Sequence, residues 1–159
     1  MIKVTRINIP CPVGGYDGDK KMEAVLAEKL AEVGLTIQDI SIPESALISP
    51  HENNASHFGN WVFVFAVDSP QLRKANLVFD MDQYLLEAQD IEALKVGDKV
   101  SYQFTNFLAG QSTGTGTVAG IRRGEMWDKP FLEVSILKAR SRTKGHRFYA
   151  GEFVKITKA

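Results

Sequence analysis

The sequence predicts an α+β protein. An N-terminal α/β portion is expected to carry one clear helix on a sheet, and a C-terminal portion to form a small antiparallel β-barrel of the SH3-like kind. Apolar residues recur at helical spacing over residues 20–33, an apolar run covers residues 61–67, and apolar residues alternate with polar ones beyond Gly97. We therefore divide the chain into residues 1–95 and 96–159, two portions that alternatively form one continuous domain.

The first element expected is a strand over residues 2–9. Its apolar alternation slips by one place near Thr5 and Arg6, and such a slip predicts a β-bulge. Residues 61–67, WVFVFAV, are apolar at every position, so they are expected to form a central strand covered on both faces. Two further short strands are expected at residues 36–42 and 76–80.

Two helices are expected in the N-terminal portion. In the first, residues 20–33, Asp19 is expected to cap the first turn and Gly34 to end the helix in a Schellman motif. The second covers residues 82–94, although the preceding LVF run alternatively continues as a strand. Proline, asparagine and glycine punctuate residues 43–60, which predicts a loop there.

The C-terminal portion has the pattern of short strands separated by turns. Val100, Tyr102 and Phe104 alternate with polar residues, whereas residues 106–116 are rich in Gly, Ser and Thr and predict a loop. Further strands are expected at residues 115–121, 131–137 and 147–156. Four short strands within about 60 residues fit a small barrel, an architecture that implies no particular function.

The formal net charge is zero, with 19 Lys and Arg against 19 Asp and Glu, but the charges are unevenly distributed. Residues 1–95 hold 8 basic and 14 acidic residues, whereas residues 96–159 hold 11 and 5. Such asymmetry is typical of proteins with an anionic partner. Alternatively, the two oppositely charged portions attract each other within the fold or across a homo-oligomer.

The sequence also bears on the cellular compartment of the protein. The longest unbroken apolar run has seven residues, far fewer than the roughly 20 that a membrane-spanning helix needs. Lys3 and Arg6 stand where a signal peptide would carry its apolar stretch. The single cysteine, Cys11, excludes an internal disulfide. We therefore expect a cytoplasmic protein without a membrane partner.

Two basic segments form the main candidate site, and we expect them to be neighbouring loops that make one patch. The first, KARSRTKGHR, runs from Lys138 to Arg147, and the second, RRGEMWDK, opens at Arg122. Cations beside aromatic rings contact a phosphate backbone and stack on bases. The residues expected to contact phosphates are Arg122, Arg123, Lys138, Arg140, Arg142, Lys144 and Arg147, and those expected to stack are Trp127 and Tyr149. Alternatively, these segments are charged hairpin tips that only keep the sheet soluble and blunt its edges.

Other candidate sites are weaker. The glycine-rich loop after Cys11 lacks the spacing of nucleotide-binding motifs, and Asp17 stands where a CxxxxxR phosphatase would carry its arginine, so Cys11 is interpreted as structural. His51 and His57 are six residues apart, unlike the i, i+4 pair of HExxH, although Glu52 adds a carboxylate. No catalytic residue, metal or cofactor is assigned.

The sequence thus favours a non-catalytic binding or accessory protein that presents a basic loop surface to a polyanion, most readily a nucleic acid. One alternative is an interaction or inhibitor protein for an acidic protein partner, since the same cations attract carboxylates. The other is a small enzyme that uses the loop at residues 11–19. The sequence leaves open whether the protein forms a homo-oligomer.

Overall fold

A computed structural model describes residues 1–12, 14–48, 55–58, 61–75, 78–106 and 110–159. It confirms an α+β fold with antiparallel sheets and few helices. The chain divides into two compact units. The N-terminal unit comprises residues 3–42 and 53–82, and the C-terminal unit comprises residues 1–2, 43–52 and 83–159.

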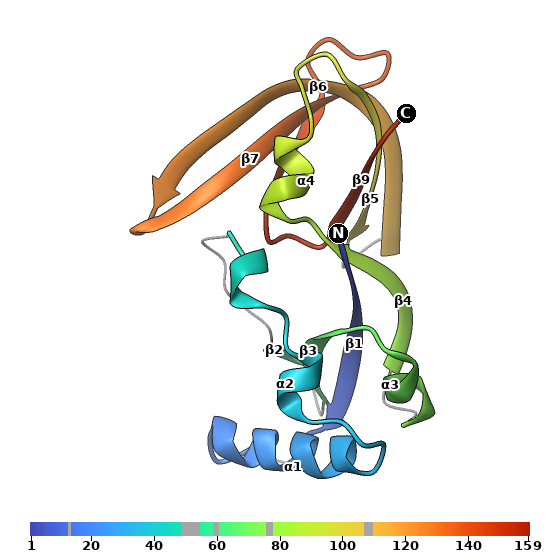
Figure 1. Cartoon of the computed structure of the whole chain (residues 1–159), viewed down its shortest axis with the longest axis vertical. Helices are drawn as coiled ribbons and strands as arrows, with labels where there is room; N and C mark the ends of the chain where they lie inside the picture. Colours follow the sequence, from blue (N-terminus) through green and yellow to red (C-terminus); the bar gives the residue numbers. More distant parts are fainter. Residues whose placement is uncertain (13, 49–54, 59–60, 76–77, 107–109) are drawn as a thin grey trace. The chain divides into compact units, whose positions relative to one another are not determined.

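The first sheet has the strand order β2-β3-β1-β4. Antiparallel pairing joins β2 to β3 and β3 to β1. The strands are β1 (Ile2–Pro10), β2 (Ala55–Phe58), β3 (Trp61–Val67) and β4 (Val78–Leu85) (Figure 1).

The bulge predicted near Thr5 and Arg6 is wrong. β1 pairs with β3 in unbroken register from Val4 to Pro10. Thr5 is buried on the same face as Ile7, so a small polar residue occupies a core position and the apolar pattern slips although the backbone does not.

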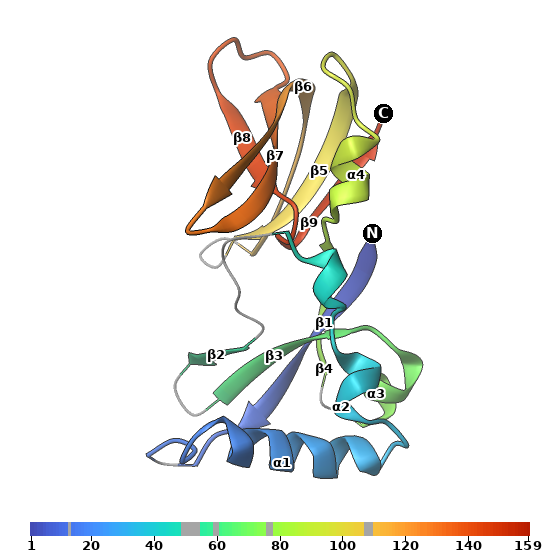
Figure 2. The same ribbon diagram turned by 60° about the vertical axis from the view of Figure 1, so that its left-hand side comes forward.

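Helix α1 (Asp19–Ala31) is found where the spacing predicted it (Figure 2). Its buried residues Leu26 and Leu30 pack with Ile7 and Ile9 of β1 in the core of the N-terminal unit. The helix begins at Asp19, and Gly18 rather than Asp19 occupies the N-cap position.

The predicted C-terminal end of this helix is confirmed. Gly34 has φ +75° and its amide donates to the carbonyl of Ala31 at 3.1 Å. The amide of Leu35 donates to the carbonyl of Leu30 at 3.0 Å. These two bonds define a Schellman motif.

Several expected elements of residues 36–94 differ in the structure. The strand expected at residues 36–42 is instead α2 (Ile37–Ile40), because Thr36 and Asp39 form a capping box. The helix expected at residues 82–94 is wrong in its first half, where β4 continues to Leu85. Three other short helical segments are η1 (Glu44–Ala46), α3 (Pro70–Lys74) and α4 (Ala88–Glu92).

The second sheet has the order β8-β7-β6-β5-β9. Its strands are β5 (Lys99–Asn106), β6 (Gly110–Met126), β7 (Lys129–Lys138), β8 (Gly145–Tyr149) and β9 (Val154–Lys158). The predicted strand at residues 147–156 is two strands, and part of the predicted loop at residues 106–116 is the beginning of β6.

The predicted barrel is not found, because β8 and β9 remain the edges of an open sheet in the described part of the chain. The sheet is curved nevertheless (Figure 1). Residues 110–117 of β6 pair with β5, whereas residues 116–126 pair with β7, and the register shifts between Val118 and Gly120. This irregularity places a bend where β6 passes from one partner to the other.

The core of the C-terminal unit lies on one face of this curved sheet. Residues Leu132, Val134 and Ile136 of β7 are buried at alternate positions, and Ile91 of α4 packs in the same cluster.

No helix among the described residues is long and apolar enough to span a membrane.

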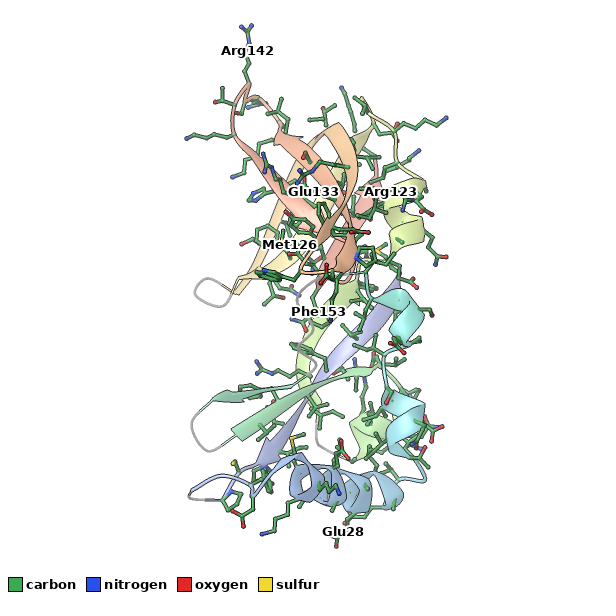
Figure 3. The ribbon with its side chains drawn as sticks, turned by 90° about the vertical axis from the view of Figure 1, so that its left-hand side faces the viewer. Glu28, Arg123, Met126, Glu133, Arg142 and Phe153 are labelled. Carbon is green, nitrogen blue, oxygen red and sulfur yellow. The ribbon has the colours of Figure 1, made fainter. Side chains whose placement is uncertain are left out.

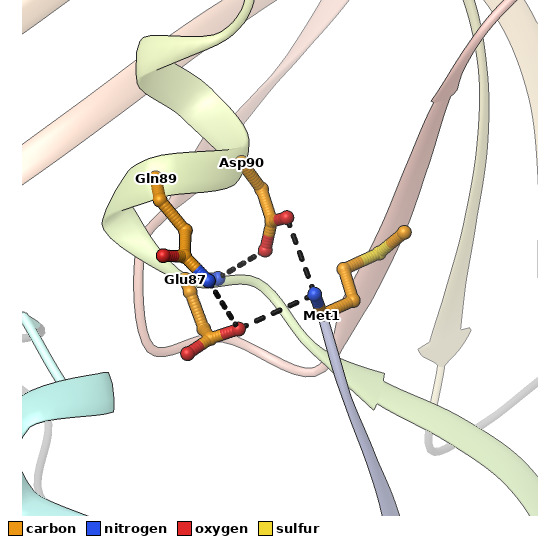
Figure 4. Close-up of polar contacts among 4 residues, drawn as sticks. All are labelled: Met1, Glu87, Gln89 and Asp90. Carbon is orange, nitrogen blue, oxygen red and sulfur yellow. Dashed lines mark hydrogen bonds and ion pairs between the residues drawn. The ribbon is translucent and has the colours of Figure 1, made fainter.

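Helix α4 begins with a capping box formed by Glu87 and Asp90 (Figure 4). The amino group of Met1 lies 3.3 Å from a carboxylate oxygen of each. Burial lowers the pKa of this amino group, but the hydrogen bonds with the two carboxylates outweigh burial, so the pKa is raised above its ordinary value.

Candidate polyanion-binding surface

The turn between β7 and β8 carries four exposed cations, Lys138, Arg140, Arg142 and Lys144, which we call the basic turn. None of the four forms an ion pair with any described residue. Arg142 projects from the far end of the turn (Figure 3).

Hydrogen bonds to a backbone carbonyl and to the hydroxyl of Ser141 hold the basic turn in shape. The amide of Lys138 donates to the carbonyl of Lys144 at 2.9 Å, and the Oγ of Ser141 accepts from the amide of Lys144 at 2.9 Å. Arg140 adopts φ +62°, the left-handed region that closes the turn. None of the four charged side chains takes part in these bonds, and all four are exposed.

Arg122 and Arg123 do not belong to this surface. Both lie within β6, and successive side chains of a strand point to opposite faces of the sheet. Arg122 lies 3.2 Å from Glu133, and Arg123 forms an ion pair with Glu92 of α4. Each of these two arginines therefore has a carboxylate partner already.

The expectation that the two basic segments form one patch is wrong. The second predicted loop is only a two-residue turn, Trp127 and Asp128, both with positive φ. This turn and the basic turn stand at opposite ends of the ten residues of β7, about 30 Å apart along the strand. Successive turns of an antiparallel meander alternate between the two ends of the strands, so neighbours in sequence are separated in space.

The predicted stacking residues also lie away from the basic turn. Trp127 is 73% exposed at the opposite end of β7. The ring of Tyr149 is half-buried edge-on against Phe131, with the ring centres 5.7 Å apart. Arg147 is exposed on β8 and lies opposite Ser135.

The hydroxyl of Tyr149 donates to Glu133, which stands between Tyr149 and Arg122 in the register of three strands. Burial raises the pKa of Glu133, but the hydrogen bonds from Tyr149 and Arg122 outweigh burial and lower it below its ordinary value. The same hydrogen bond, with burial, raises the pKa of Tyr149. Glu133 is therefore a buried carboxylate with two hydrogen-bond donors, Tyr149 and Arg122.

A hollow of about 540 Å³ lies beside the basic turn, and the sequence did not predict it. Its lining residues come from β5, β6, the end of β7 and the start of β8: Tyr102, Phe104, Ser112, Thr113, Gly114, Thr115, Lys138, Ala139 and His146. We call it the aromatic groove. The alternation of Tyr102 and Phe104 indicated only that they share a face, and nothing in the sequence paired β5 with β6 or placed His146 beside them.

The imidazole of His146 forms part of an aromatic cluster in this groove. Its ring is stacked on Phe148 with 5.6 Å between centres, and the rings of Phe104 and Tyr102 lie 5.2 and 5.4 Å away. Burial, with Lys138 nearby, lowers the pKa of His146 below its ordinary value. A lowered pKa favours the uncharged imidazole, a planar aromatic ring like those of its neighbours.

The loop at residues 11–19 does not assemble a reactive centre among the residues described. Cys11 is a free, half-buried thiol, and the hydroxyl of Tyr16 donates to the carbonyl of Pro10. Asp17 forms an exposed ion pair with Lys21 at 2.9 Å. No group of three or more His, Cys, Asp or Glu side chains gathers anywhere in the described ranges. His51 and Glu52 lie outside those ranges, and His57 is in β2.

Comparison with protein-family models, with curated proteins and with solved structures finds no match to this chain.

Proposed function

We propose that the C-terminal unit binds nucleic acid through the basic turn. The observation that supports this proposal is the density of cations in the turn, where four exposed cations that are unpaired in the described part of the chain lie within seven residues. Arg122, Arg123 and Lys158 each form an ion pair with a carboxylate, whereas the four cations of the basic turn form none among the described residues.

The sequence around the turn strengthens this contrast. Residues 134–151 contain no Asp or Glu, so no acidic residue within that segment competes for these cations. Their potential therefore extends into the solvent, where a phosphate backbone supplies closely spaced negative charges. Four basic side chains within seven residues are enough to contact several consecutive phosphates of a nucleic acid.

The test is a salt-dependent binding titration against DNA, RNA and heparin. Each phosphate neutralised on duplex DNA contributes about −0.9 to the slope of log K against log salt, so four contacts predict roughly −3.6. The double variant Arg140→Glu/Arg142→Glu is expected to weaken binding to all sequences alike and to flatten this slope by about half.

A matched control makes the same change of charge elsewhere. Lys20→Glu/Lys74→Glu alters two exposed cations of the N-terminal unit and is expected to leave the slope unchanged. Absence of binding by the unaltered protein at about 50 mM salt, where screening is weak, would contradict the proposal. Equal losses in both double variants would show that only the net charge matters.

A further inference from the structure

The aromatic groove exists because β6 presents small residues on one face. Ser112, Gly114 and Gly116 occupy alternate positions and share the face toward which Tyr102 and Phe104 point from β5. A methyl group at Gly114 would lie 2.4 Å from the hydroxyl oxygen of Tyr102. Gly114 thus makes room for the tyrosine ring, and the small residues Ser112 and Gly114 line the hollow beside it.

The groove combines three kinds of chemistry on its walls. Phe104 and His146 supply aromatic surface, and both remain partly exposed. Ser112 supplies a hydroxyl group on the same face of the sheet, and Lys138 supplies a positive charge. Its volume of about 540 Å³ falls within the range of roughly 300–1,000 Å³ that is typical of small-molecule sites.

The groove is continuous with the basic turn. Lys138 and Ala139 line the groove and also begin the turn. The amide of Ala139 donates to the carbonyl of Thr115 on β6 at 2.9 Å, which fixes the start of the turn against the groove wall. A chain whose phosphates lie along the turn would therefore pass the mouth of the groove.

We propose that the aromatic groove binds one unstacked base of a single-stranded nucleic acid whose phosphates contact the basic turn. This inference rests on the proposed function and specifies its substrate class. An aromatic wall stacks on the face of a base, and the hydroxyl group of Ser112 can accept from or donate to its edge. A base within a duplex is covered on both faces by its neighbours, so only an unpaired base can enter.

The test compares two ligands with the same number of phosphates. One is an oligothymidylate of about ten nucleotides, and the other is an abasic oligomer of equal length. Fluorescence anisotropy at about 50 mM salt is expected to show the oligothymidylate binding about tenfold more tightly, since stacking of a base contributes an effect of this order.

Four variants locate the preference within the fold. His146→Ala is expected to remove most of the tenfold difference, whereas His146→Phe, which keeps an aromatic ring, is expected to retain it. Ser112→Leu fills the groove without removing an aromatic residue and is expected to act like His146→Ala. Trp127→Ala removes an exposed aromatic residue at the opposite end of β7 and is expected to change nothing.

The outcomes separate the two proposals. Equal, salt-dependent affinities for both oligomers would overturn the groove as a base site and leave the basic turn as a phosphate site. A preference that survives both His146→Ala and Ser112→Leu would also overturn it. Failure to bind either oligomer would overturn the proposed function itself.

Discussion

Glu133 is an ionisable residue whose side chain is almost fully buried. Its side chain is 4% exposed, yet it remains a carboxylate because Arg122 and Tyr149 both bond to it. A buried carboxylate without partners would be strongly destabilising, so the three side chains act as a unit. Their alignment across three neighbouring strands ties β6, β7 and β8 together through side chains as well as through the backbone.

Replacing Glu133 by Gln is expected to lower the free energy of unfolding at pH 7 by about 1–3 kcal/mol, because Arg122 and Tyr149 lose their charged acceptor. The pKa of Glu133 is lowered in the folded protein, so its contribution is fully present above the ordinary Glu pKa of about 4.3 and is lost as the pH falls through the lowered value. Urea denaturation between pH 7 and pH 3 measures both effects.

The control for this variant is Glu125→Gln, which removes the same charge from an exposed position on β6. It is expected to change stability by less than about 0.5 kcal/mol. If Glu133→Gln were equally mild at pH 7, the three side chains would not stabilise the sheet.

At the scale of the element, β6 decides the shape of the second sheet. It has 17 residues, and its two halves pair with different neighbours. Glycines along β6 serve different purposes. Gly114 admits the ring of Tyr102, and Gly116 admits the backbone of Leu137, whereas an added Cβ at Gly120 would meet no atom within 4 Å.

These differences predict unequal effects of one substitution. Gly114→Ala is expected to destabilise the protein by about 1–3 kcal/mol, because the buried ring of Tyr102 must move within its aromatic cluster. Gly120→Ala is expected to be nearly neutral, since its Cβ enters open space and no positive φ is required. Thermal and denaturant unfolding of the two variants make the comparison, and equal losses would contradict this account of β6.

At the scale of the whole molecule, the described residues form two hydrophobic cores, and the two units differ less in charge than the two halves of the sequence do. Each core cluster contains residues of one unit alone. The units carry 7 basic against 9 acidic residues and 12 against 10, so the uneven charge seen along the sequence is much smaller between the units. Charge therefore gathers locally, at the basic turn, rather than over a whole unit.

Two separate cores predict local effects of truncating a core residue. Ile7 and Ile136 are both fully buried or nearly so, one in each core, and replacement by Ala is expected to cost about 2–5 kcal/mol in either case. Amide hydrogen exchange followed by mass spectrometry is expected to show faster exchange chiefly in the unit that carries the substitution. Equal acceleration in both units would show that they unfold as one cooperative body.

Local interactions explain what the sequence predicted correctly. Helix α1 and its Schellman end follow from residues within one or two turns of each other, and β5 follows from the alternation of Val100, Tyr102 and Phe104 along one strand. The short helix α2 was predicted as a strand because a four-residue helix offers too few positions for its period to appear.

In the candidate site, too, the sequence predicts local features, whereas features that depend on distant residues appear only in the tertiary structure. The sequence by itself determined that a basic turn between two strands would lie within residues 138–147, because charge and turn residues are local properties. Only the tertiary structure decided that Arg122 and Arg123 are engaged by carboxylates and that Trp127 lies at the far end of β7. It alone placed Phe104 and His146, 42 residues apart in the sequence, on one groove beside Lys138. The physical reason is strand pairing: the register between distant strands fixes which side chains meet, and the pattern within one strand does not say which other strand it pairs with.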